Sequence, residues 1–219
     1  MPAHGILLVE PSWVSGQLWE RPMERNELSL DADPRWRRLH DRTWTCPECG
    51  VPHGGLFDLA SGKPDSWEGN DQDKALNATA ATSRHFLSED FCVRNGEDHF
   101  VRCVLEIPVV GGGGKLFAYG VWSSLSAKNF STYVETFDSG EQGSLGPWFS
   151  WFSNRLKGYP DTLNLKCQVH PRNGRQRPWV ELEPTDHPLA VEQRDGVTLD
   201  RILEIYAFNG HDFRRLLVD

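Results

Sequence analysis

The chain has 219 residues, of which 38% are hydrophobic, and it contains no apolar run near the roughly 20 residues that cross a bilayer. Its formal net charge of -8 would repel a phosphate backbone, which argues against a nucleic-acid-binding protein. We therefore expect one globular domain with an appendage, located in the cytoplasm because the N-terminus does not resemble a secretory signal.

The first part of the chain differs from the rest. Residues 1–43 mix Pro, Trp, Arg and Glu without a sustained period, and we expect a loosely ordered N-terminal appendage there. Within it, residues 35–40 are expected to form a short helix, which carries too little apolar surface to stay in place without docking. A single domain is expected over residues 44–219.

The sharpest motif is a C-x-x-C pair followed by a histidine. Cys46 and Cys49 are separated by two residues, and Gly50 follows, which predicts a tight turn whose backbone N–H groups point at both sulfurs. His53 is a third candidate ligand, and zinc is the cofactor that such a half-site indicates. A redox dithiol and a pair of unligated loop cysteines are the alternatives.

A structural zinc site needs a fourth ligand, which this motif does not supply. The candidates elsewhere in the chain are Cys92, Cys103, Cys167, His85, His99, His170 and His187. Cys103 is expected in the core instead, because its neighbours on one face of a predicted strand are aliphatic. Five cysteines, an odd number without a secretory context, argue against a disulfide framework.

Two hairpins are predicted from alternating apolar residues around Asn-Gly dipeptides. The first joins residues 91–94 to residues 99–109, and the second joins residues 162–170 to residues 179–183. Residues 116–125 are expected to add a strand after a glycine-rich loop.

The helices are predicted from caps and periodicity. Ser126 is expected to cap a helix that ends near Phe137, and Thr198 a second one that Asn209-Gly210 terminates. Residues 148–156 are aromatic on both faces and indicate a buried strand or short helix. The expected fold is α+β: an antiparallel meander-type sheet of about five or six strands packed with two or three helices, with the Cys-x-x-Cys turn at the start of the domain.

Polar residues gather at the end of the second predicted hairpin. Those that could serve a catalytic site are Asp161, His170, Glu183, Asp186 and His187. Carboxylates and imidazoles can share protons near neutral pH and can hold a catalytic metal. The simpler interpretation is that Asp186-His187, between two prolines, forms a turn that caps the following helix.

Several segments together resemble a known family. CPECG with His53, GYPDTLNLK and LEPTDHPLAVEQRDG are similar to the bacterial family known as domain of unknown function 2199, and FVRCVLEIPV, GVWSSLSAKNF and WFSNRLKGYPDTLNLK extend the resemblance over residues 44–206. Cys46, Cys49 and His53 match the family's C-x-x-C-x-x-x-H arrangement. The resemblance implies no particular activity and carries over no catalytic residue.

Three functions remain as hypotheses. The first is a bacterial cytoplasmic protein that acts as a zinc-binding, non-enzymatic binding or regulatory module. The second is a metal-assisted hydrolase with its site at the Asp186-His187 end of the second hairpin. The third is a protein that binds a basic protein partner through its acidic surface.

Overall fold

The computed structural model describes residues 29–41, 45–69, 75–212 and 214–217. These residues form four α-helices and one eight-stranded mixed sheet. The helices are α1 (Pro34–Leu39), α2 (Ala127–Phe137), α3 (Pro188–Asp195) and α4 (Leu199–Phe208). The strands are β1 (Leu59–Ala60), β2 (Phe86–Leu87), β3 (Phe91–Arg94), β4 (Asp98–Pro108), β5 (Leu116–Leu125), β6 (Trp148–Trp151), β7 (Lys166–His170) and β8 (Trp179–Leu182).

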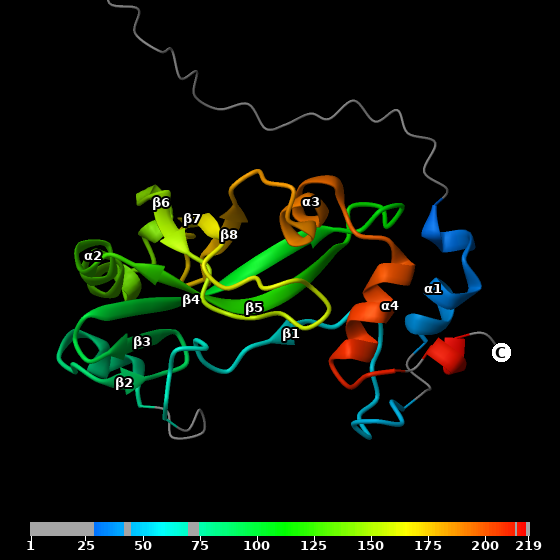
Figure 1. Cartoon of the computed structure of the whole chain (residues 1–219), viewed down its shortest axis with the longest axis horizontal. Coiled ribbons are helices and arrows are strands. Elements are labelled where there is room, and N and C mark those ends of the chain that lie inside the picture. Colours follow the sequence, from blue (N-terminus) through cyan, green and yellow to red (C-terminus); the bar gives the residue numbers. More distant parts are fainter. Residues whose placement is uncertain (1–28, 42–44, 70–74, 213, 218–219) are drawn as a thin grey trace, which may run out of the picture.

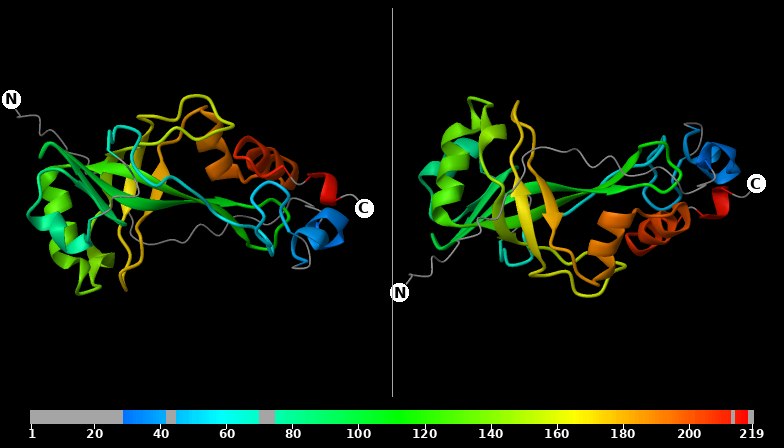
Figure 2. Two further views of the ribbon diagram at one scale, coloured as in Figure 1. Left: turned by 90° about the horizontal axis from the view of Figure 1, so that it is seen from below. Right: turned by 90° about the horizontal axis from the view of Figure 1, so that it is seen from above.

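The long β4–β5 hairpin is the axis of the molecule. Its strands pair antiparallel from His99 opposite Leu125 to Pro108 opposite Leu116. Figures 1 and 2 show α2, β2 and β3 at one end of this hairpin and α1 and α4 at the other end. Alternate residues of β4 face the core, and Cys103 among them is fully buried, as the alternation predicts.

Both predicted hairpins are confirmed. In the first, Arg94 lies opposite Asp98 across the Asn95-Gly96 turn, where both turn residues have positive φ. In the second, His170 lies opposite Trp179. Residues 162–165, which precede β7, are not part of its strand.

The predicted meander of five or six antiparallel strands is wrong. The strand order is β1-β5-β4-β8-β7-β6, with β3 also on β4 and β2 on β3, and the β1–β5 and β4–β8 pairs are parallel. β1 and β2 have two residues each, which is too short for a periodic signal. The parallel pairs join segments that are far apart in the chain, so no turn motif in the sequence predicts them.

The aromatic segment forms β6, which runs back beside β5. Ser150 Oγ donates a hydrogen bond to Ser124 O at 2.6 Å, and an isolated bridge links Ser123 to Phe152. Phe152 is fully buried, whereas Phe149 and Trp151 remain 47% and 41% exposed. Core packing, the expected role of these aromatics, therefore holds for one face of the strand only.

The helix caps follow the sequence. The Ser126 hydroxyl accepts from Asn129 N–H at the start of α2, and the Thr198 hydroxyl accepts from Arg201 N–H at the start of α4. The short α1 buries Trp36 and Leu39 in the main core, next to the turn at residues 214–217. The boundary expected at residue 44 stays a prediction. No helix in the described part of the chain is long and apolar enough to cross a membrane.

Asn154 is a fully buried residue that holds the loop after β1 against β5. Its Oδ1 accepts from Trp122 N–H at 2.7 Å, and its Nδ2 donates to Lys63 O at 2.8 Å. We expect Asn154→Ala to lower the free energy of unfolding by about 2–4 kcal/mol, because buried polar groups lose their partners. Urea denaturation measures this change.

The control is Asn173→Ala, which removes a single exposed hydrogen bond from Gly143 N–H. Its expected cost is below about 1 kcal/mol. Equal losses in the two variants would contradict the role given to Asn154.

Candidate metal centre

The Cys turn, residues 45–53, is compact, as its sequence predicts, and the backbone hydrogen bonds that close it run to carbonyl oxygens. Cys46 N–H donates to Val51 O at 3.0 Å, and Gly50 N–H donates to Cys46 O at 2.9 Å. Gly50 has a φ of 70°, which a residue with a side chain rarely adopts. The turn therefore depends on the glycine that follows the second cysteine.

Two histidines complete a cluster with the two cysteines. The Cys/His cluster consists of Cys46, Cys49, His53 and His211, whose ligand atoms all lie within 4.8 Å of one another. Cys49 Sγ is 3.2 Å from His53 Nε2, and Cys46 Sγ is 3.9 Å from His211 Nδ1. In a tetrahedral zinc site, bond lengths of about 2.0–2.3 Å place neighbouring ligand atoms roughly 3.3–3.8 Å apart. The cluster thus needs to contract by about 1 Å across its widest pair to hold such an ion.

His211 is not among the fourth ligands considered from the sequence. It follows the Asn209-Gly210 end of α4, and its N–H donates to Tyr206 O at 2.9 Å, as part of the helix terminus. The candidates that were considered lie elsewhere: Cys92, Cys103 and Cys167 are buried in the core, His85 stacks on Trp67, His99 contacts Phe130, His170 stacks on Trp179, and His187 caps α3. The sequence offers only a helix-ending signal before His211, which says nothing of its neighbours.

An aromatic stack positions both imidazoles. The His53 ring stacks on Phe57 with centroids 4.1 Å apart, and Phe57 stacks on Tyr206 of α4 at the same separation. His211 meets Phe57 edge-on at 5.2 Å. Tyr206 also holds the backbone, because its hydroxyl accepts from Phe57 N–H at 2.9 Å and donates to Phe57 O at 2.8 Å. α4 therefore orients His53 through Phe57.

The surroundings of the cluster favour a metal-binding form of His53. Burial lowers the pKa of His53, and the neighbouring His211 lowers it further by repulsion between the two charged forms. A neutral imidazole keeps the lone pair that a metal needs. Cys46 is fully buried and Cys49 is exposed, so the cluster lies at the surface with one protected thiol.

The residues considered for a hydrolase site have other contacts. His170 Nε2 lies 3.0 Å from Glu181 Oε2, and burial lowers the pKa of His170 although Glu181 opposes the shift. His187 Nδ1 accepts from Leu189 N–H at 3.2 Å, which makes His187 the N-cap of α3.

The carboxylates of that hypothesis are dispersed. Asp161 pairs with Arg155 at 3.2 Å, Asp186 is exposed and Glu183 is half-buried. Among the described residues, only the Cys/His cluster brings three or more potential ligands close enough to share a metal ion.

We expect Tyr206→Phe to lower the free energy of unfolding by about 1–3 kcal/mol, because two backbone groups of Phe57 lose their partner. Tyr133→Phe is the matched control. Tyr133 is equally buried, but its hydroxyl has no hydrogen-bond partner among the described residues, so its removal costs nothing comparable. Urea denaturation compares the two variants directly. Equal losses in the free energy of unfolding would contradict the role given to the Tyr206 hydroxyl.

Comparison with known proteins identifies the family. Residues 45–197 match the sequence model of the family DUF2199, described as an uncharacterized protein conserved in bacteria. This region includes Cys46, Cys49 and His53 and ends before His211. Searches of curated proteins and of solved structures found no match. The match spans well over half of the chain and confirms the resemblance seen in its motifs: the chain belongs to the DUF2199 family.

Proposed function

We propose that this protein is a non-enzymatic binding or regulatory module stapled by a zinc ion on Cys46, Cys49, His53 and His211. The observation that carries the proposal is the convergence of these four side chains from two distant segments of the chain. A shared metal ion is the simplest explanation for two thiols and two imidazoles that surround one point.

The donor set favours zinc and a structural role. Two thiolates and two imidazoles in a tetrahedral arrangement are a common structural zinc site. Catalytic zinc sites use three protein ligands and keep the fourth position open for water. Four protein ligands leave no such position, which supports a non-enzymatic module.

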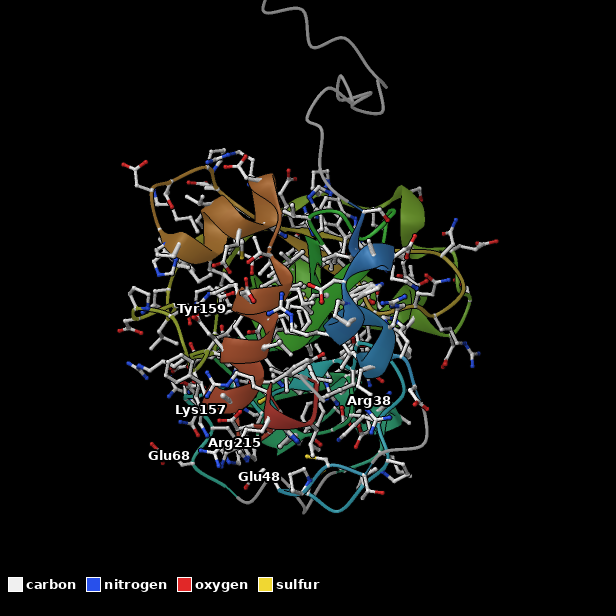
Figure 3. The ribbon with its side chains drawn as sticks, turned by 90° about the vertical axis from the view of Figure 1, so that its right-hand side faces the viewer. Arg38, Glu48, Glu68, Lys157, Tyr159 and Arg215 are labelled. Atoms are coloured by element: carbon white, nitrogen blue, oxygen red, sulfur yellow. The ribbon has the colours of Figure 1, made fainter. Side chains whose placement is uncertain are left out.

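The location of the cluster indicates what the ion would stabilise. It would tie the Cys turn to the C-terminal end of α4, and no strand pairing among the described residues joins these two segments. Figure 3 shows Glu48 of the Cys turn and Arg215 of the C-terminal turn on the side of the molecule that faces the viewer. Metal-binding free energy at such a site adds directly to the free energy of folding.

We also propose that the protein is cytoplasmic, and its cysteines support this cellular location. None of the five cysteines, all of which the structure describes, forms a disulfide, which suits a reducing cytoplasm where disulfides are rare. We also propose that residues 44–219 act as the stapled domain, with residues 1–43 as an appendage that docks on it through Trp36 and Leu39 of α1.

Elemental analysis of the chelator-washed, untagged full chain tests the zinc site. We expect one zinc per chain in the wild type, none in Cys46→Ser/Cys49→Ser and a strongly reduced content in His211→Ala. His85→Ala is the matched control, since His85 stacks on Trp67 and has no part in the cluster, and it should keep its zinc. A wild-type protein without metal, or an unchanged content in the cysteine double variant, would refute the site.

The structural role has its own test. A strong chelator should lower the thermal unfolding midpoint of the wild type, whereas the cysteine double variant should start from the lower midpoint and not respond to the chelator. Circular dichroism follows both transitions. A wild type that loses its zinc but keeps its midpoint would exclude a structural staple.

A further inference from the structure

The five cysteines, all of which the structure describes, differ in how well a small oxidant can reach them. Cys49 is exposed, whereas the other four are buried. Glu48, the residue before Cys49, is exposed as well, on the side of the molecule that Figure 3 shows. Cys49 therefore carries the thiol that a small oxidant in solution meets directly.

Burial also makes the cysteines of the sheet poor competitors for an oxidant. The thiolate, not the thiol, is the nucleophile that attacks an oxidant. Burial raises the pKa of Cys92 to about 12 and that of Cys167 to about 11. It raises the pKa of Cys103 too. At neutral pH these three side chains are protonated thiols, so oxidation is directed to the Cys turn.

A second thiol lies close to Cys49. The sulfurs of Cys46 and Cys49 belong to the Cys/His cluster, whose ligand atoms all lie within 4.8 Å of one another. A disulfide holds its two sulfurs about 2.0 Å apart. A movement of less than about 3 Å within one turn therefore brings the two sulfurs to bonding distance.

A zinc ion and a disulfide exclude each other at these two sulfurs. Zinc binds thiolates, and a tetrahedral site keeps neighbouring ligand atoms roughly 3.3–3.8 Å apart. A disulfide removes both negative charges and brings the sulfurs much closer together. His53 and His211 then remain as two ligands of the cluster, too few for a structural zinc site. Oxidation of the cysteine pair thus releases the ion.

We propose that Cys49 is a modification site, which a peroxide oxidises, and that the disulfide it then forms with Cys46 expels the zinc ion. Because the ion is the one proposed above, this regulation rests on the proposed function. The zinc site and the redox dithiol, which are alternatives on the sequence alone, become the reduced and the oxidised state of one turn.

The reaction takes place in two balanced steps. The Cys49 thiolate attacks one oxygen of hydrogen peroxide, so that an S–O bond forms, the O–O bond breaks and hydroxide leaves, which makes Cys49 a sulfenic acid. The Cys46 thiolate then attacks the Cys49 sulfur, so that the S–S bond forms, the S–O bond breaks and a second hydroxide leaves. Each hydroxide takes a proton from the solvent. The two thiolates are oxidised, and the peroxide is reduced to two water molecules.

Loss of the ion frees the Cys turn from the C-terminal end of α4. Tyr206 keeps its two hydrogen bonds to the backbone of Phe57, so α4 itself stays in place. Amide hydrogen exchange, measured by mass spectrometry, should therefore rise after oxidation in residues 45–53 and 209–212 and stay unchanged in β4 and β5. Unchanged exchange in both of the first two segments would contradict this consequence.

The main experiment adds hydrogen peroxide to the zinc-loaded full chain. A chelating dye measures the released zinc, and mass spectrometry of peptides measures the disulfide. We expect one zinc ion to be released for each Cys46–Cys49 disulfide, and we expect a dithiol reductant with added zinc to reverse both changes. Cys92→Ala is the matched control, because it removes a thiol outside the cluster and should release zinc as the wild type does.

Two single variants assign the roles of the two sulfurs. Cys46→Ser and Cys49→Ser each lack one ligand of the cluster, so they are compared with each other, with circular dichroism to verify their folding. A diketone reagent labels sulfenic acids. Cys49 should be labelled in Cys46→Ser, where no second thiol reacts with it, whereas Cys46 should be labelled about tenfold less in Cys49→Ser, because it is buried.

The zinc content before peroxide is added separates this inference from the proposed function. A chain that holds no zinc overturns both. A chain that keeps its zinc in peroxide, or releases it without a Cys46–Cys49 disulfide, overturns the modification site alone and leaves the zinc staple standing. Equal labelling in the two single variants would contradict the assignment of the first step to Cys49.

Discussion

The pairing of β4 with β5 is the constraint on which the rest of the structure depends. Its ladder extends from His99 to Pro108, and every other strand of the sheet joins one of its two edges, either directly or through a neighbouring strand. β1 lies on the outer edge of β5, while β3 and β8 share the outer edge of β4. Because the hairpin is long, its two ends lie far apart, and a different set of helices packs at each end.

At the end formed by α1 and α4, the chemistry depends on a side chain that carries no ligand atom. Tyr206 is fully buried, and it clamps Phe57 by two hydrogen bonds and by stacking. Contacts that fix a potential ligand's side chain help to orient it toward a metal ion. Packing of α4 and the position of His53 in the Cys/His cluster are thus linked, because Tyr206 of α4 holds Phe57, on which the His53 ring stacks.

The other end is built differently. There, α2 packs beside the turn of β3 and β4, and Phe130 of α2 meets Phe91 of β3 edge-on. The residues considered for a hydrolase site are dispersed around α3 and β7.

The sequence alone determined what depends on neighbours within a few residues. Ser126 and Thr198 cap their helices, Asn95-Gly96 turns the first hairpin, and the C-x-x-C-G run closes the Cys turn, because each is a local hydrogen-bonding or backbone preference. Only the tertiary structure decided the parallel strand pairs and the position of His211, rather than any of the seven other candidates, beside the Cys turn. Those outcomes follow from how the buried faces of distant segments pack together. No local preference determines where the C-terminal end of α4 lies relative to the Cys turn.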